Sequence, residues 1–230
     1  MSRSKPVVNI SNPAKVVLEW AGAADAGYFK YYDKEAKEKK AVQLPFKFAY
    51  LDEMTAILGF SPKYQSNLFS NEVRFMSETL NIMAFADGKV KHLKEGVYKD
   101  IKEDVQAMGG KYHKIIYGAV IESQDEGLRK GDIIRIAIKG SGVSSWGDFK
   151  SKHTGTIVVG KDSGKNGAVT YTFPTFESEE ISPEDDKMAM EADIKLQEFF
   201  EERSKADFSK SDEPEGEAKK EEEPEEDCPY

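Results

Sequence analysis

Few residues of this chain have the types and spacing that catalysis or metal binding requires. The three histidines, His92, His113 and His153, fall on separate segments without short metal-ligand spacing, and the single cysteine, Cys228, lies in the last three residues. A zinc site needs several such ligands close together. A nuclease or other phosphoryl-transfer enzyme would gather carboxylates around magnesium, and the acids of residues 1–176 are scattered. We therefore expect no metal, no cofactor and no catalysed reaction, and the phosphoryl-transfer alternative ranks last.

One phosphate-loop pattern occurs at residues 155–161, Gly-Thr-Ile-Val-Val-Gly-Lys. The next residue is Asp162, where Ser or Thr should hold magnesium, and the four residues between the glycines favour a strand. The pattern therefore predicts a strand that leads into a hairpin tip at residues 160–167. Lys161 and Lys165 in that tip could contact a phosphate backbone.

Aromatic residues interleaved with cations suit a different chemistry, the binding of unpaired nucleic acid. On a strand, Tyr28, Lys30 and Tyr32 would project from one face, while Phe29 and Tyr31 point to the other. Bases stack on aromatic rings and phosphates attract cations. One face of this segment can therefore enter the core and leave the other for nucleic acid.

Two further segments carry cations on one strand face. In the first, residues 111–117, Tyr112 and Lys114 share a face. In the second, residues 132–139, three isoleucines share one face, and Arg135 and Lys139 point to the other. An apolar inner face with a cationic outer face suits a strand that follows a sugar-phosphate backbone.

A polar segment rich in Gly and Ser, residues 144–152, is expected to be a loop. Trp146 and Phe149 would be exposed stacking rings there, beside Lys150 and Lys152. Three other rings are expected in the core: Trp20, Phe46 and Phe48. The complete set of expected nucleic-acid contacts is Tyr28, Lys30, Tyr32, Lys47, Lys111, Tyr112, Lys114, Arg135, Lys139, Trp146, Lys150 and Lys152.

Charge divides the chain into two parts. The net charge of the whole chain is -9, but residues 177–230 hold 22 acids and 7 bases, which leaves residues 1–176 with a net charge of +6. Such asymmetry indicates a nucleic-acid or interaction function. Residues 1–176 are long enough to form one domain with its own core. The lone cysteine and the lack of an apolar N-terminal run or spanning segment lead us to expect a soluble cytoplasmic protein.

Strand patterns dominate residues 1–176. Alternating, β-branched or aromatic runs bounded by turn residues predict strands at 14–20, 28–32, 42–51, 80–85, 89–93, 111–122, 132–139, 154–159 and 168–173. Residues 98–108 change to helical spacing, and residues 52–77 predict a short helix plus loop. This order favours a mainly β fold, an OB-like Greek-key barrel with one helix between strands. Extra hairpins or a β-sandwich variant are alternatives.

The last 54 residues predict a helix followed by a tail. Ser182 as cap and Pro183 in the first turn begin a helix that should reach about Arg203. Its apolar stripe suits either the body of the protein or a second subunit, so a homodimer is an alternative. The expected units are a body at 1–176, an amphipathic helix at 177–206 and a disordered acidic tail at 207–230.

The final residues of the chain carry a family resemblance. They read Glu225-Glu226-Asp227-Cys228-Pro229-Tyr230, an acidic run that closes on proline and an aromatic ring. This resembles the end of bacterial single-stranded DNA-binding proteins, which finish Asp-Asp-Asp-Ile-Pro-Phe, with Cys in place of Ile and Tyr in place of Phe. The overall plan is most similar to the phage-type proteins, in which an OB-like body precedes an acidic tail capped by an aromatic.

The resemblance implies a single-stranded DNA-binding protein of phage DNA replication, recombination or repair, in the cytoplasm of a bacterial host. It also implies that the tail binds replication proteins such as polymerase and helicase-primase, and competes with DNA for the body's groove. The alternative is an acidic-tailed protein-interaction or chaperone module that does not bind DNA.

Overall fold

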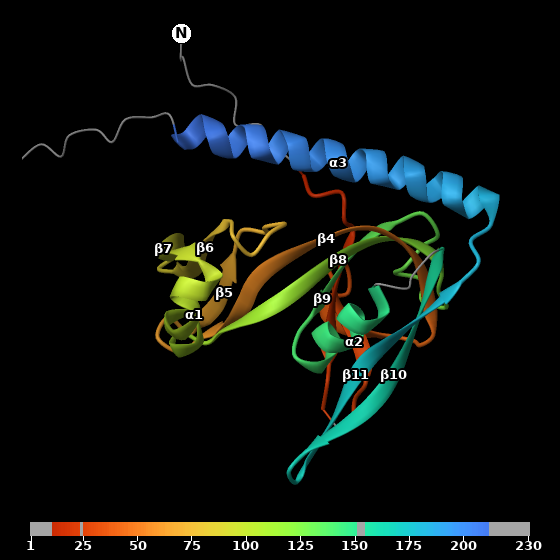
Figure 1. Ribbon diagram of the computed structural model, residues 1–230, viewed down its shortest axis with the longest axis horizontal. Coiled ribbons are helices and arrows are strands. Elements are labelled where there is room, and N and C mark those ends of the chain that lie inside the picture. Colours follow the sequence, from red (N-terminus) through yellow and green to blue (C-terminus); the bar gives the residue numbers. More distant parts are fainter. Residues whose placement is uncertain (1–10, 24, 151–154, 212–230) are drawn as a thin grey trace, which may run out of the picture.

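The computed structural model describes residues 11–23, 25–150 and 155–211 (Figure 1). Its strands and helices follow one another as β1 (Val16–Ala21), β2 (Tyr28–Asp33), β3 (Glu38–Val42), β4 (Phe46–Ser61), β5 (Ser66–Ser70), β6 (Thr79–Ala86), β7 (Lys89–Val97), α1 (Tyr98–Ala107), β8 (Gly110–Glu122), β9 (Ile133–Ile138), α2 (Ser141–Lys150), β10 (Thr156–Asn166), β11 (Val169–Glu179) and α3 (Pro183–Ser211). The predicted mainly β fold is confirmed.

The strands form one open mixed sheet in the order β3-β2-β1-β9-β8-β4-β5-β6-β7, and β10 pairs with both β4 and β11. Only β1 and β9 run parallel among the described strand pairs. The 16-residue strand β4 pairs with β10 and β5 in addition to β8, because register shifts near Lys47 and Tyr50 bend it. β4 therefore connects the β1–β3 part of the sheet to the β5–β7 part.

An isolated β-bridge joins the beginning of β11 to the segment that follows β1. Ala23 pairs with Tyr171, the backbone N–H of Thr172 donates to the Gly22 carbonyl at 3.0 Å, and the indole Nε1 of Trp20 donates to the Thr172 carbonyl at 2.9 Å. The sheet thus curves back toward itself. The OB-like closure expected from the sequence stays a prediction.

The main core lies inside this curved part of the sheet. Ile134, Ile136 and Ile138 of β9 are fully buried there, as the alternation predicted. Phe46 and Phe48 are also core residues, as expected, whereas Trp20 is only partly buried against this core. A second apolar cluster lies between β5, β6 and α1, where Ile57, Leu68, Leu80, Ile82 and Val105 meet.

The helix predicted at residues 98–108 is confirmed as α1, and it ends where Gly109 takes a positive φ of 90°. Close backbone packing at this point leaves no room for a side chain at Gly59. A Cβ on Gly59 would lie 2.2 Å from the Gly109 carbonyl oxygen, so β4 and the end of α1 touch backbone to backbone.

The helix plus loop expected at residues 52–77 is wrong. β4 continues to Ser61, and β5 follows at Ser66–Ser70. Met54 and Ala56 pack toward α3 while Ile57 packs toward α1, so apolar residues occupy both faces of this strand. A strand buried on both faces loses the alternation by which it would be recognised.

The loop expected at residues 144–152 is also wrong, because Ser141–Lys150 forms α2. Val143, Trp146 and Phe149 stand at helical spacing and pack on the core, which outweighs the low helix propensity of the Gly and Ser residues around them. Trp146 is only 1% exposed, and its Nε1 donates to Glu53 at 2.8 Å. The prediction that Trp146 is an exposed stacking ring is therefore wrong.

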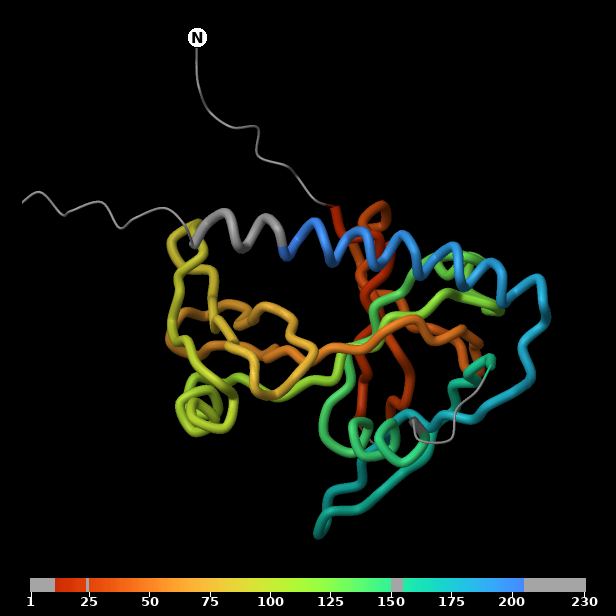
Figure 2. The backbone as a smooth tube through the Cα atoms, turned by 45° about the horizontal axis from the view of Figure 1, so that its top comes forward, coloured from red at the N-terminus to blue at the C-terminus, as the bar shows by residue number. Residues whose placement is uncertain are grey.

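Helix α3 is a long helix that lies across one face of the sheet (Figures 1 and 2). Ser182 caps it through its Oγ, which accepts a hydrogen bond from the Asp185 N–H at 3.1 Å. The apolar stripe, with Ala189, Leu196 and Phe199, packs on the face of β4 and β8 in the same chain. The helix runs to Ser211, so the expected boundary at 206 falls inside it, and residues 212–230 of the tail lie outside the described residues.

No helix within the described ranges has the combined length and apolarity that crossing a membrane requires.

We predict that Trp146→Ala lowers the free energy of unfolding by about 3–5 kcal/mol, because it leaves a cavity against the rings of Tyr50 and Phe176. Urea unfolding followed by circular dichroism measures the change. Phe75→Ala is the matched control, since that ring is 67% exposed and its loss should change stability by less than about 0.5 kcal/mol. Equal effects of the two substitutions would contradict the buried position of Trp146.

Candidate nucleic-acid interface

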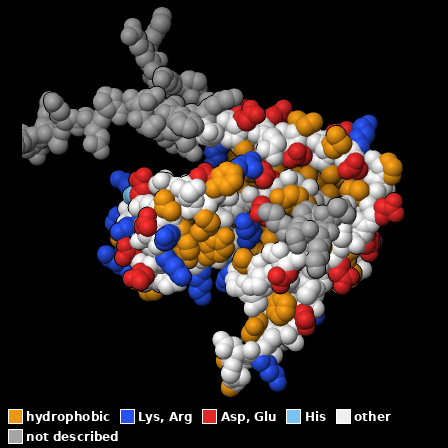
Figure 3. Space-filling view, viewed as in Figure 1, with side chains coloured by type: hydrophobic (Ala, Val, Ile, Leu, Met, Phe, Trp, Pro, Cys, Tyr) orange, Lys and Arg blue, Asp and Glu red, His pale blue; other side chains and the backbone are white. Residues whose placement is uncertain are grey.

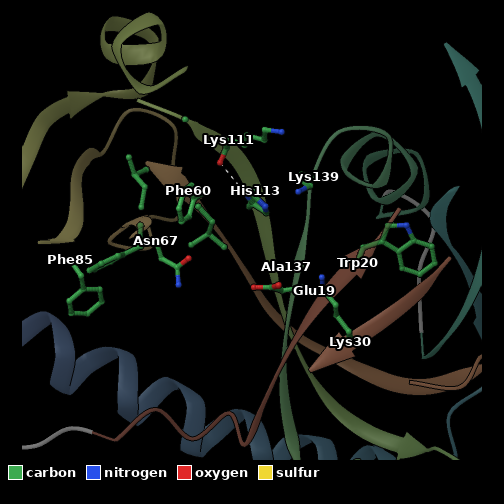
Figure 4. A pocket seen from close by; sticks show the side chains of 15 residues that line it. Glu19, Trp20, Lys30, Phe60, Asn67, Phe85, Lys111, His113, Ala137 and Lys139 are labelled. Atoms are coloured by element: carbon green, nitrogen blue, oxygen red, sulfur yellow. Dashed lines mark hydrogen bonds between the residues drawn. The ribbon is translucent and has the colours of Figure 1, made fainter. Parts of the chain in front are cut away.

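A cleft of about 660 Å³ crosses the sheet from β2 to β6 (Figure 4). Its lining follows the strand order: Lys30 of β2, Glu19 and Trp20 of β1, Ala137 of β9 with Lys139 just beyond it, Lys111 and His113 of β8, Leu58 and Phe60 of β4, Asn67 and Phe69 of β5, and Phe85 of β6. Seven adjacent strands about 4.8 Å apart span roughly 29 Å. The cleft therefore has the length of a short nucleic-acid segment.

The cleft and α3 share one face of the sheet. On β8, Ile115 and Tyr117 pack beneath α3, while Lys111 and His113, which follow the same alternation, line the cleft. On β9, Ile133 and Ala137 both belong to the apolar cluster that includes the α3 residues, and Ala137 also lines the cleft. Figure 3 shows the molecule hollowed between the β5–β7 side and the β10–β11 hairpin, with Lys or Arg side chains at the edge.

Three lysines give one part of the cleft a positive charge. Among the described residues, no carboxylate lies within 4.0 Å of the ammonium groups of Lys30, Lys111 or Lys139. The pKa of Lys139 is lowered first by desolvation, then by the charge of Lys111, with Glu19 acting in the opposite direction and Lys30 lowering it further. A lysine whose charged form is disfavoured in this way gains from a bound anion.

Aromatic rings form the other part of the cleft. Phe60 is 51% and Phe85 52% exposed, and Phe69 lies against Phe85 with ring centroids 5.3 Å apart. Half-exposed phenylalanines beside lysines suit stacked bases with adjacent phosphates. Trp20 lies on β1 in the cationic part of the cleft, and its indole N–H donates to the Thr172 carbonyl.

His113 is buried and supplies no positive charge at neutral pH. Its pKa is lowered from 6.5 to about 4, mainly by burial; the hydrogen bond to the Lys111 backbone opposes this shift, and the charges of Lys139 and Arg135 add to it. The carbonyl oxygen of Lys111 accepts at 2.8 Å, so Nδ1 of the neutral ring carries the proton. His113 thus orients the Lys111 backbone and does not bind phosphate as a cation.

A second groove shares Lys139 and Trp20 with the cleft. This groove of about 480 Å³ lies between α2 and the β10–β11 hairpin, and Gly140, Tyr171 and Phe173 also line it. Lys139 and Trp20 are thus lining residues of both hollows.

Of the sequence-predicted residues, Lys30, Lys111 and Lys139 come together in the cleft. The predicted alternation of β2 is confirmed, because Phe29 and Tyr31 are buried while Tyr28 and Tyr32 are exposed on the face of Lys30. These two tyrosines lie along the strand on either side of Lys30.

Three predicted cations are held by carboxylates and lie outside the cleft. Lys47 contacts Glu122 at 3.2 Å and Glu179 at 2.9 Å. Lys114 contacts Glu53 at 3.2 Å. These lysines are paired with carboxylates, which a sequence pattern cannot show, and their contact with nucleic acid stays a prediction.

Arg135 is the third of these cations, and it lies in a nearly buried network. Its Nε donates to Glu72 Oε1 at 2.7 Å, and the Tyr117 hydroxyl donates to Glu72 Oε2 at 2.7 Å. Tyr112 is half-buried, with its hydroxyl 3.2 Å from Thr55 Oγ1 and its ring against Tyr98. The side chain of Lys150, the whole of Lys152 and residues 225–230 lie outside what the structure describes.

The sequence interpretation missed Phe60, Asn67, Phe69 and Phe85. Phe85 had a signal, because Leu80, Ile82 and Ala84 alternate into the core and leave Phe85 on the opposite face. The other three lie in residues that were assigned to a helix and loop.

A scan against protein-family models and searches of curated proteins and of solved structures found no match for this chain. Within the described ranges, no group of three or more His, Cys, Asp or Glu side chains is placed to hold a metal ion. The function is therefore inferred from the residues of the cleft.

We predict that the free energy of unfolding falls by roughly 3 kcal/mol between pH 6.5 and pH 4 because of His113, whose pKa is about 4 in the folded chain. Between pH 6.5 and pH 4 the imidazole of His113 is protonated in the unfolded chain and neutral in the folded chain, so a fall in pH favours unfolding. His113→Asn keeps a donor near the Nδ1 position and removes the titration. Its urea-unfolding free energy should therefore depend less steeply on pH, and identical pH profiles would rule out this role.

Proposed function

We propose that this chain is a single-stranded DNA-binding protein of phage replication, recombination or repair, which binds DNA without catalysing a reaction. The observation that carries the proposal is the cleft, where Lys30, Lys111 and Lys139 stand without carboxylate partners among the described residues, beside the exposed rings of Phe60 and Phe85.

Single-stranded DNA fits this arrangement better than duplex DNA. The rings of Phe60 and Phe85 need the flat face of a base, and in a duplex neighbouring bases cover those faces. Each stacked base contributes about 1–3 kcal/mol with little dependence on its identity, and the lysines contribute through counterion release. The strand would cross the sheet from Lys30 to Phe85, with the exposed Tyr28 and Tyr32 beside its cationic end.

The acidic tail is the second part of the proposal. Residues 212–230 hold 10 acids and 2 bases, so they carry a charge of opposite sign to the three lysines. A tail of this kind can occupy the cleft when DNA is absent and bind replication proteins such as polymerase and helicase-primase when DNA displaces it. The OB-like barrel belongs to the same proposal, and the bridge between Ala23 and Tyr171 supports it.

We predict that the double variant Lys111→Gln/Lys139→Gln binds oligo-dT more weakly and depends less on salt. If each lysine neutralises one phosphate, the slope of log K against log salt should fall in magnitude by about 1.4. Lys195→Gln, an exposed lysine on α3, is the control and should retain the parent slope.

Tryptophan fluorescence reports this binding, and the structure identifies the reporter. Trp20 lines the cleft, whereas Trp146 is buried in the core. Quenching by oligo-dT should therefore persist in Trp146→Phe and disappear in Trp20→Phe. Unchanged tryptophan fluorescence during titration with oligo-dT at low salt would contradict the proposal and favour the alternative, an acidic-tailed protein-interaction or chaperone module.

We predict that removing residues 212–230, a net charge of -8, tightens binding to oligo-dT at low salt. This truncation leaves α3 complete, so its packing on the sheet is preserved. The effect should vanish at high salt, where charge competition is screened. A truncated chain that binds no more tightly than the full chain would contradict competition by the tail.

A further inference from the structure

The aromatic part of the cleft contains an ordered row of three side chains. Phe60 of β4 is the register partner of Asn67 of β5. The pairing of Leu68 with Ala84, continued by one residue, brings Asn67 opposite Phe85 of β6. All three line the cleft from adjacent strands (Figure 4), so a phenyl ring stands on each side of a carboxamide.

The spacing of this row suits a base. Two rings on strands that are two positions apart lie about 9.6 Å apart at their backbones. A base stacked on both sides needs about 6.8 Å between the rings, two spacings of about 3.4 Å, so the rings must lean toward one another from their backbones to hold it. The short side chain between the rings leaves the space above it open, and contact with Phe69 supports Phe85 from the side.

Asn67 provides the polar group at the floor of this row. Its carboxamide is exposed and makes no hydrogen bond to other described residues. The group offers two donor hydrogens and an acceptor oxygen, which match the edge of adenine at N6 and N7. Thymine lacks that pairing. In the cationic part of the cleft the lysines bind phosphate regardless of the base, and the carboxylate of Glu19 offers acceptors only.

We propose that Phe60, Asn67 and Phe85 form a base pocket, in which one unpaired base lies between the two rings and Asn67 hydrogen-bonds its edge with a preference for adenine. This inference rests on the proposed binding of single-stranded DNA. It adds base discrimination to a cleft that otherwise binds DNA through stacking and charge.

Substitution of the rings tests the pocket. With oligo-dT of about 12 nucleotides, Phe60→Ala and Phe85→Ala should each weaken binding about 5- to 150-fold and leave the salt slope unchanged. Phe75→Ala removes an exposed ring outside the cleft and should bind like the parent. Thermal unfolding of each variant verifies its fold. Parent-like binding by both Phe60→Ala and Phe85→Ala would overturn the pocket.

Asn67→Ala tests the base preference. The ratio of affinities for oligo-dA and oligo-dT should fall about fivefold or more relative to the parent, because the pairing to adenine is lost. Self-stacking of free oligo-dA is the same for both proteins and cancels in the comparison. An unchanged ratio would overturn the role of Asn67.

These outcomes separate the base pocket from the proposed function. If Lys111→Gln/Lys139→Gln weakens binding while all three pocket variants bind like the parent, the pocket is wrong and DNA binding by the cleft stands. If the full chain binds neither oligonucleotide at low salt, both proposals are wrong.

Discussion

The pairing of β4 with β8 is the interaction on which the rest of the structure depends. It runs from Lys47 to Gly59 along one strand and from Glu122 to Gly110 along the other. Because β4 is bent by its register shifts, its first residues pair with β10 in the curved part of the sheet and its last residues pair with β5. One strand thus places the lysines and the phenylalanines of the cleft on a common surface.

A single face of this strand pair serves two purposes. Where the alternating residues are apolar, such as Met54 and Ile115, α3 covers them and completes a core. Further along the same strands the residues become Phe60 and Lys111, and α3 does not cover them. The contrast with Lys114 is informative, because that lysine contacts Glu53 beside the Trp146 indole and so stabilises the fold. Cations that hold the structure together have carboxylate partners, whereas the cleft lysines have none among the residues that the structure describes.

The sequence predicted the mainly β character, α1, α3 and the alternation of β2 and β9, because in each case one face is buried and the other is not. It failed for β4 beyond Leu51, where both faces are buried, and for α2, where packing of Trp146 overrides weak helix propensity. The sequence identified Lys30, Lys111 and Lys139 as candidate contacts. That they lie in one cleft depends on the strand order β2-β1-β9-β8, which the sequence does not show. Pairing of distant strands is invisible to local patterns. Phe60 and Asn67 were missed because they lie in the segment that was assigned to a helix and loop.

The most direct test of DNA binding by the cleft is photo-crosslinking of the full chain to oligo-dT that carries bromodeoxyuridine, followed by mass spectrometry of the crosslinked peptides. Our account predicts crosslinks in the peptides that contain Trp20, Phe60 and Phe85, and their loss at high salt. Crosslinks confined to peptides outside the cleft, such as the one with the exposed Phe75, would contradict it.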